Sequence, residues 1–124
     1  MSLEEYFGDW LKVIDKKTLY KTINILNTID SSTLCPNYNN IFNCFTACNL
    51  SDLKVVILGM SPYPQLNKAT GIAFGNKRET LDEDLSPSLQ VIKESVINYE
   101  IPQNSVIFDP SFEDWEKQGV LMLN

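Results

Sequence analysis

The sequence predicts a single α/β domain with a mostly parallel sheet, and two observations carry this prediction. The segment 54–58 is continuously apolar after Lys54, and so is the segment 120–123, as is typical of parallel strands that are buried on both faces. Amphipathic helical spacings precede the first segment and lie between the two, which is the order of elements that parallel crossovers require. The length of 124 residues suits one domain, so we expect a single domain over residues 1–124.

Helical spacing is clearest in the first thirty residues. Apolar side chains three and four positions apart predict an amphipathic helix over residues 3–14. After a polar break at Lys16 and Lys17, the same spacing predicts a second helix over residues 19–29. Turn-forming residues at 30–33 should end that second helix.

Shorter elements follow on either side of the first strand. Asn39 or Asn40 could cap a short helix over residues 41–45. After the strand, a Pro-rich loop leads to a further helix that should begin at Ser86 or Ser88.

The last twenty residues contain three more signals. Residues 105–108 indicate a weak strand or an extended piece. Ser111 starts a pattern similar to a capping box, so a short helix should carry Trp115 and end at a Gly119 cap.

Composition excludes several classes of protein. Ten basic and sixteen acidic residues give a net charge of −6, which argues against a general nucleic-acid coat or a binder of anionic membranes. No apolar run is long enough to cross a bilayer, and the acidic N-terminus does not suit a secretion signal. Three cysteines cannot all pair within one chain, which favours reduced thiols and a cytoplasmic location, in a bacterium or a virus-infected host cell, or a nuclear one in a eukaryote. With no histidine, the commonest general base and metal ligand is missing, and a zinc site would need ligands from outside the chain.

Fold class alone indicates where a ligand would bind. In open α/β sheets, ligands lie outside the carboxyl ends of the strands. Two segments occupy such positions, namely the loop after Leu58 and Asn124 after Leu123.

Four ordered motifs make the function more specific. Residues 54–64, Lys-Val-Val-Ile-Leu-Gly-Met-Ser-Pro-Tyr-Pro, resemble the water-activating motif of family 1 uracil-DNA glycosylases, in which Gly-Gln-Asp-Pro-Tyr-His follows an apolar strand. Residues 69–74, Ala-Thr-Gly-Ile-Ala-Phe, are similar to the family's Ala-His-Gly-Leu-Ala/Cys-Phe. Residues 86–89 match its Pro-Ser-Leu loop, and residues 115–124 match its Trp-Ala-x-Gln-Gly-Val-Leu-Leu-Leu-Asn. The resemblance covers about residues 35–124.

This resemblance implies a three-layer α/β/α fold of the uracil-DNA glycosylase type, here truncated. It also implies an N-glycosyl hydrolase of DNA base-excision repair, which flips deoxyuridine out of DNA and cleaves its N-glycosidic bond without metal or cofactor. The expected partner is uracil-containing DNA, single- or double-stranded, and no membrane is expected.

The resemblance also assigns roles to individual residues. Ser61 would hold the attacking water. Asn124 offers an amide donor and acceptor to the imide edge of uracil, and Phe74 can stack on the base. Tyr63 would clash with a thymine methyl group, and the backbone N–H of Met60 would bind a base oxygen. The residues expected to contact the DNA backbone through hydroxyls and backbone groups are Pro62, Ser86, Pro87 and Ser88.

Two departures from the family pattern leave alternatives open. Ser61 replaces the family's aspartate, so it carries no charge and is a poor base, while Pro64 replaces the final histidine. The family pattern also continues beyond Asn124 into a second, histidine-containing loop. Three explanations of these departures are left open. The chain is the N-terminal part of a longer protein, or it is one half of an assembly whose second chain supplies the missing C-terminal half. In the third explanation it is an inactive paralogue that binds DNA or a replication protein.

Overall fold

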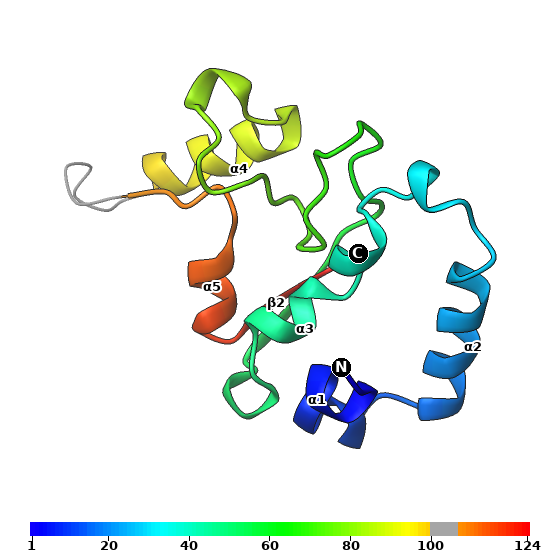
Figure 1. Cartoon of the computed structure of the whole chain (residues 1–124). Coiled ribbons are helices and arrows are strands. Elements are labelled where there is room, and N and C mark those ends of the chain that lie inside the picture. The colour runs from blue at the N-terminus through cyan, green and yellow to red at the C-terminus, as the bar shows by residue number, and fades with distance from the viewer. Residues whose placement is uncertain (100–106) are drawn as a thin grey trace.

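A two-stranded parallel sheet forms the centre of the fold (Figure 1). The computed structural model describes residues 1–99 and 107–124. Strand β1 (Val55–Leu58) pairs with β2 (Val120–Leu123) from Val55 opposite Val120 to Leu58 opposite Leu123. Both predicted strands and their parallel pairing are therefore confirmed, and the described residues form this one sheet of mixed helix-and-strand architecture.

Helices surround the sheet at several angles (Figure 1). They are α1 (Leu3–Phe7), α2 (Lys16–Leu26), α3 (Asn43–Ala47), α4 (Pro87–Asn98) and α5 (Glu113–Lys117). None of the helices among the described residues has the length and apolar character needed to cross a membrane.

The predicted helix over residues 3–14 is interrupted at Gly8. A capping box between Ser2 and Glu5 starts α1, but Gly8 has a φ of +52° and ends it. The chain continues as a 3₁₀ helix over Gly8–Lys12. The predicted polar break before the next helix is also wrong, because the Asp15 side chain accepts a hydrogen bond from the Thr18 N–H and caps α2.

The later helices begin close to where the sequence places them. Ser86 is the N-cap of α4, and Pro87 occupies its first turn. The N-cap of α5 is Phe112, in a left-handed conformation with φ of +59°, so the expected cap Ser111 lies one position before the observed one. Neither Asn39 nor Asn40 caps α3, since Phe42 precedes it without a side-chain cap.

Of the expected extended piece at 105–108, residues 105 and 106 lie outside the described residues. Ile107 and Phe108 are described and are not part of a strand.

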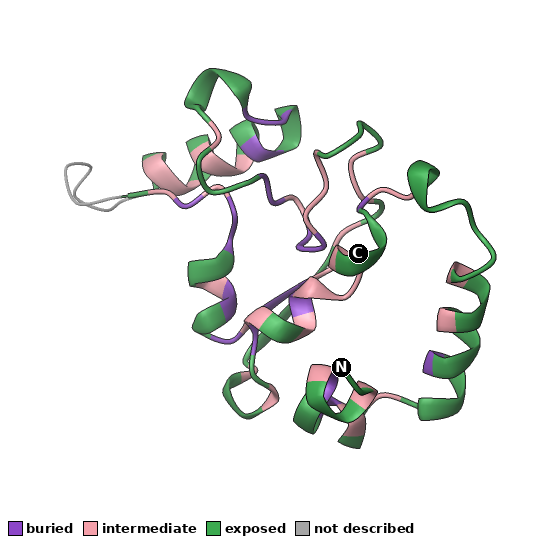
Figure 2. Ribbon diagram, viewed as in Figure 1, coloured by how far each residue is buried: buried purple, intermediate pink, exposed green. Residues whose placement is uncertain are grey.

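Two apolar clusters form the core, and the ribbon of the buried residues is purple in Figure 2. The first joins α1, α3 and Leu121 of β2, and the second joins the loop after β1, α4, α5 and Met122 of β2. Side chains alternate between the faces of a strand, so neighbouring residues of β2 serve different clusters. Leu121 and Met122 are 4% and 1% exposed, which makes β2 the buried strand.

Strand β1, in contrast, is exposed, and the prediction that it is buried on both faces is wrong. Val55, Val56 and Leu58 are 50%, 53% and 75% exposed. The physical reason is that both clusters pack mainly over β2, while no described element pairs with the outer edge of β1. An apolar strand without a neighbour keeps its unpaired backbone groups and its side chains in water.

A buried carboxyl group fastens α5 to β2. Glu116 is 0% exposed, and its Oε1 accepts a hydrogen bond of 2.9 Å from the Met122 N–H. Its Oε2 is buried without a hydrogen-bond partner among the described residues. Burial raises the pKa of Glu116 to about 8, although the bond from Met122 acts in the opposite direction. Glu116 is therefore held as a neutral acid at neutral pH.

The ionisation of Glu116 predicts a specific pH dependence of stability. Its folded pKa of about 8 lies above the ordinary 4.5, so its contribution is complete below pH 4.5 and is lost as the pH rises towards 8. Glu116→Gln keeps the acceptor for Met122 and removes the ionisation. The free energy of unfolding of the variant should therefore rise relative to that of the wild type as the pH rises. The difference should reach on the order of a few kcal/mol at pH 8, since one pKa unit is about 1.4 kcal/mol.

Denaturant unfolding across this pH range measures the effect, with Glu94→Gln on the exposed surface of α4 as the matched control. Parallel pH profiles for the Glu116→Gln variant and the wild type would contradict the assignment.

Candidate functional site

The carboxyl ends of the two strands lie side by side. The Gly59 N–H donates a hydrogen bond of 2.7 Å to the Leu123 carbonyl oxygen, which extends the strand pairing by one residue. A β-carbon at Gly59 would lie 3.1 Å from the Cβ of Asn124 and 3.3 Å from the Cβ of Ala73. Glycine therefore allows the loop after β1 to leave the sheet in contact with Asn124, and the two segments that the fold class singled out meet.

A pocket with a volume of about 400 Å³ opens at this point, within the roughly 300–1,000 Å³ range of small-ligand sites. Apart from Ser86 and Pro87, every residue that the sequence proposed for the site lines it. The lining consists of Met60, Ser61, Pro62, Tyr63, Pro64, Ala69, Gly71, Ile72, Phe74, Ser88 and Asn124. None of these side chains carries a charge, so the pocket suits a neutral ligand that has both polar and flat apolar surfaces.

Two aromatic residues are fixed to each other at the pocket wall. The Tyr63 hydroxyl donates a hydrogen bond of 2.8 Å to the Phe74 carbonyl oxygen. Phe74 has a φ of +63°, a conformation that non-glycine residues rarely adopt and that the surrounding contacts must hold in place. Burial raises the pKa of Tyr63, and a hydrogen bond with the Ser86 side chain lowers it in part. Tyr63 is consequently a neutral phenol at physiological pH.

The segment that carries Phe74 is held by hydrogen bonds to two different parts of the fold. On one side, the Asn43 Nδ2 donates to the Thr70 carbonyl oxygen at 2.8 Å, and the Cys44 N–H donates to the Gly71 carbonyl oxygen at 3.2 Å. On the other side, the Ala73 N–H donates to the Met122 carbonyl oxygen of β2 at 2.9 Å. The pocket wall is thus bonded both to α3 and to the sheet.

The exposure of the loop after β1 differs from residue to residue. Met60 is 98% exposed and Ser61 is also exposed, whereas Pro62 and Tyr63 are half-buried. Ser61 brings a neutral hydroxyl to the pocket and no charged group. Its predicted role as the residue that holds a water remains a prediction.

The residues predicted for the DNA backbone occupy different environments. Ser88 lines the pocket, and Pro87 is exposed outside it. Ser86 is 5% exposed, and its N–H already donates to the Asn76 Oδ1 at 2.9 Å. Asn76 was not among the candidates from the sequence, because a polar residue after Phe74-Gly75 reads as an ordinary loop position.

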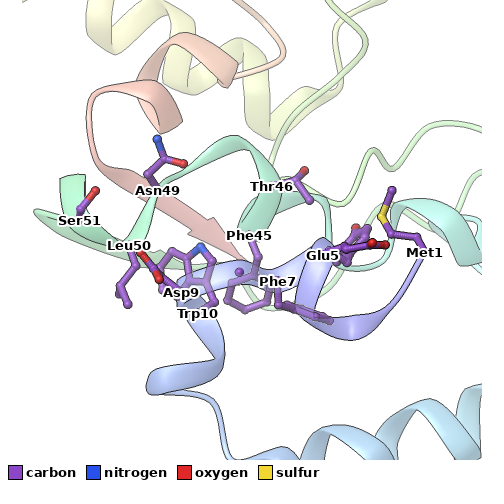
Figure 3. Close-up of a pocket in the computed structure, with 12 residues that line it drawn as sticks. Met1, Glu5, Phe7, Asp9, Trp10, Phe45, Thr46, Asn49, Leu50 and Ser51 are labelled. Carbon is purple, nitrogen blue, oxygen red and sulfur yellow. The ribbon is translucent and has the colours of Figure 1, made fainter.

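A second hollow, of about 440 Å³, lies between α1 and α3 (Figure 3). Its lining combines an aromatic seam with polar side chains, which are those of Glu5, Asp9, Thr46, Asn49 and Ser51. Phe7 and Trp10 both pack on Phe45, with ring centroids 5.9 Å and 5.2 Å away, and the Trp10 Nε1 donates to the Cys48 carbonyl oxygen. The seam joins α1 to α3, and it includes none of the motif residues.

No group of three or more cysteine, aspartate or glutamate side chains within residues 1–99 and 107–124 is arranged to hold a metal ion. Cys44 and Cys48 are buried free thiols, and burial, together with the nearby Glu116, raises the pKa of Cys44 to about 12. Neither thiol is activated as a nucleophile.

Comparison with curated proteins finds similarity to uracil-DNA glycosylases. The chain is 32% identical over 120 residues to the uracil-DNA glycosylase of Aliarcobacter butzleri, which covers 96% of this chain and 48% of that protein. It is 37% identical over 125 residues to that of Lachnoclostridium phytofermentans, covering 94% and 52%, and 38% identical over 96 residues to that of Francisella philomiragia, covering 74% and 40%. No protein-family model matches the chain.

These matches confirm the resemblance to part of a uracil-DNA glycosylase. The chain spans about half the length of the curated relatives that it matches.

The packing of the pocket wall predicts that replacing Gly71 by a larger residue destabilises the fold. Gly71 has a φ of +85°, and a β-carbon there would overlap the Asn40 carbonyl oxygen. At Gly8, with a φ of +52°, a β-carbon would meet nothing within 4 Å. Both alanine variants should lose about 1–3 kcal/mol through backbone strain. Gly71→Ala should lose a further 1–3 kcal/mol or so through the overlap.

Thermal or urea unfolding of the Gly71→Ala and Gly8→Ala variants separates strain from overlap. If the two variants lose the same stability, the overlap with the Asn40 carbonyl oxygen makes no contribution, and the close packing of Gly71 against Asn40 is contradicted.

Proposed function

We propose that this chain is the uracil-binding part of a uracil-DNA glycosylase that acts in DNA base-excision repair, and that its pocket receives a uracil flipped out of DNA. The similarity to curated uracil-DNA glycosylases supports this proposal. The observation that carries it is the convergence of Asn124, Tyr63 and Phe74 on one uncharged pocket at the carboxyl ends of parallel strands.

The chemistry of these side chains suits uracil. The Asn124 amide can donate one hydrogen bond and accept another, which matches the adjacent carbonyl and N–H of the imide edge. Cytosine presents the reverse pattern at that position and would leave the pocket's amide unpaired, which is costly in a desolvated site. Phe74 supplies a flat face for stacking. Tyr63, held by its bond to the Phe74 carbonyl oxygen, would occupy the space that a thymine methyl group needs.

The proposed reaction is hydrolysis of the N-glycosidic bond. The water oxygen bonds to C1′ of the sugar while the bond from C1′ to the base breaks, and the base leaves with the electron pair. One proton of the water is lost, and the base is finally released in its neutral form. Ser61 would position the water through its hydroxyl, without metal or cofactor.

A serine cannot supply the negative charge that stabilises a positively charged sugar in the transition state. We therefore expect the chain to recognise uracil in DNA more effectively than it cleaves the bond.

Contacts with the DNA backbone must be made without strong positive charge, because the chain has a net charge of −6. The Ser88 hydroxyl and the free N–H groups in the first turn of α4 are neutral donors beside the pocket, and such groups commonly bind phosphate oxygens. The exposed apolar strand β1 supports a larger, three-layer α/β/α fold, in which further polypeptide of the same or of a second chain covers it.

Replacement of Asn124 tests the base recognition. Asn124→Asp keeps the size of the side chain but replaces the donor by a second acceptor, which would repel a uracil carbonyl. The preference for a single-stranded oligonucleotide with one uracil over the same strand with thymine should fall by about 10-fold or more. Fluorescence anisotropy at constant salt measures both affinities.

Asn98→Asp, an exposed position at the far end of α4, adds the same charge away from the pocket and serves as the control. An unchanged uracil preference in the Asn124→Asp variant, or no preference in the wild type, would contradict the proposal.

Replacement of Ser61 tests the position of the water. Ser61→Asp introduces a base and a negative charge where the proposal places the attacking water, so release of uracil should rise by about 100-fold or more. Alkali cleavage of abasic sites in a labelled oligonucleotide measures the rate, with Ser61→Asn as a neutral control of equal size. Equal rates for the aspartate and asparagine variants would show that residue 61 does not face the reacting sugar.

A further inference from the structure

A buried side-chain amide, that of Asn76, lies two residues after Phe74, and both its oxygen and its nitrogen are hydrogen-bonded. Asn76 is 1% exposed. Its Oδ1 accepts a hydrogen bond of 2.9 Å from the Ser86 N–H, and its Nδ2 donates one of 2.9 Å to the Ser86 Oγ. The Nδ2 also lies 3.3 Å from the Gly75 carbonyl oxygen, and the Asn76 N–H donates to the Pro110 carbonyl oxygen at 2.9 Å.

These bonds connect the start of α4 to the aromatic wall of the pocket. Ser86 is the N-cap of α4, yet its side chain makes no capping bond within the helix, because it is engaged with Asn76. Along the chain, Asn76 follows Phe74 by two residues, and the Tyr63 hydroxyl donates to the Phe74 carbonyl oxygen. The bonds between Asn76 and Ser86, the short stretch of backbone from Asn76 to Phe74 and the bond from Tyr63 therefore join the start of α4 to the aromatic wall.

Because of these hydrogen bonds, Asn76 influences where the first turn of α4 lies relative to the other residues of the pocket. Ser88, two residues after Ser86 in the first turn of α4, lines the same pocket as Tyr63 and Phe74. An apolar residue in place of Asn76 would leave the buried Ser86 N–H without an acceptor, at a cost that drives such a group towards water. The first turn of α4 would then move away from the aromatic wall.

We infer that Asn76 is a positioning residue: through Ser86 it sets the distance between the first turn of α4 and the Tyr63–Phe74 wall, and so the width of the slot that receives the base. The inference rests on the proposed function for its consequence in base selection. Its structural part, the placement of α4 against the wall, is independent of that function.

Asn76→Asp makes the test specific, because the pH sets whether the introduced carboxyl group is protonated or ionised. When protonated, its carbonyl oxygen accepts from the Ser86 N–H and its O–H donates to the Ser86 Oγ, which reproduces the pair that asparagine makes. When ionised, it can only accept, so it has no donor for the Ser86 Oγ or for the Gly75 carbonyl oxygen, both of which receive a hydrogen bond from the Asn76 Nδ2 in the wild type. Burial raises the pKa of such a carboxyl group, so mild acid favours its neutral form.

The expected result is a loss of base selection that acid restores. At about pH 8 the Asn76→Asp variant should lose roughly 10-fold of its preference for uracil over thymine in single-stranded DNA. At about pH 5 its preference should return to within roughly 3-fold of the wild type measured at the same pH. Asn76→Val should show the loss at both pH values, and the control Asn98→Asp, at the exposed end of α4, should show it at neither.

Proton NMR of the free protein provides the readout that does not depend on DNA. Contacts between the rings of Tyr63 and Phe74 and the first turn of α4 should weaken in Asn76→Val, and in Asn76→Asp only at the higher pH. The melting temperature of each variant is recorded so that binding is compared between folded samples.

Unchanged ring contacts and an unchanged uracil preference in folded Asn76→Val would overturn the inference. So would a loss in Asn76→Asp that is equal at both pH values, because that result indicates general destabilisation. A wild type without any uracil preference would refute the proposed function alone, and the ring contacts would still decide whether Asn76 positions α4.

Discussion

The hydrogen bonding between β1 and β2 is the constraint on which the site depends. The strands are parallel and in register, so their carboxyl ends coincide, and the bond from the Gly59 N–H to the Leu123 carbonyl oxygen carries the pairing to the last residues. This bond places the loop after β1 against Asn124, although 65 positions separate Gly59 from Asn124 along the chain. The wall that carries Phe74 is attached to the same strand through the Ala73 N–H, so the sheet orients both sides of the pocket.

The parts of the fold that could be predicted from the sequence are those set by local patterns. An apolar run indicates a strand wherever it occurs, and the Ser86-Pro87 pair indicates a helix start, because both depend on neighbours along the chain. The burial of β1 could not be predicted in this way, since it depends on which elements lie beside it in space. The same run of apolar residues that indicates a fully buried strand is half or more exposed at Val55, Val56 and Leu58. The break at Gly8 was likewise hidden by helical spacing that continues across it.

The site shows a similar division. The residues that line the pocket belong to contiguous motifs, so the sequence could name them before their distances were known. Asn76 and Glu116 could not be found in that way, because both are polar residues that are more often exposed. Their importance comes from partners elsewhere in the chain, Ser86 for Asn76 and the Met122 N–H for Glu116. Each accepts a hydrogen bond from a backbone N–H group. Asn76 accepts from Ser86 at the start of α4, and Glu116 accepts from Met122 in β2.

The most direct test of the account is an NMR titration of the protein with free uracil, thymine and cytosine, each at the same concentrations. If the strand ends form a uracil-binding pocket, uracil should shift the NMR signals of the Asn124 side-chain amide, the Gly59 backbone N–H and the rings of Tyr63 and Phe74. Thymine and cytosine should shift these signals much less. Equal responses to the three bases, or shifts confined to the hollow between α1 and α3, would contradict the claim that the strand ends form a uracil-binding pocket.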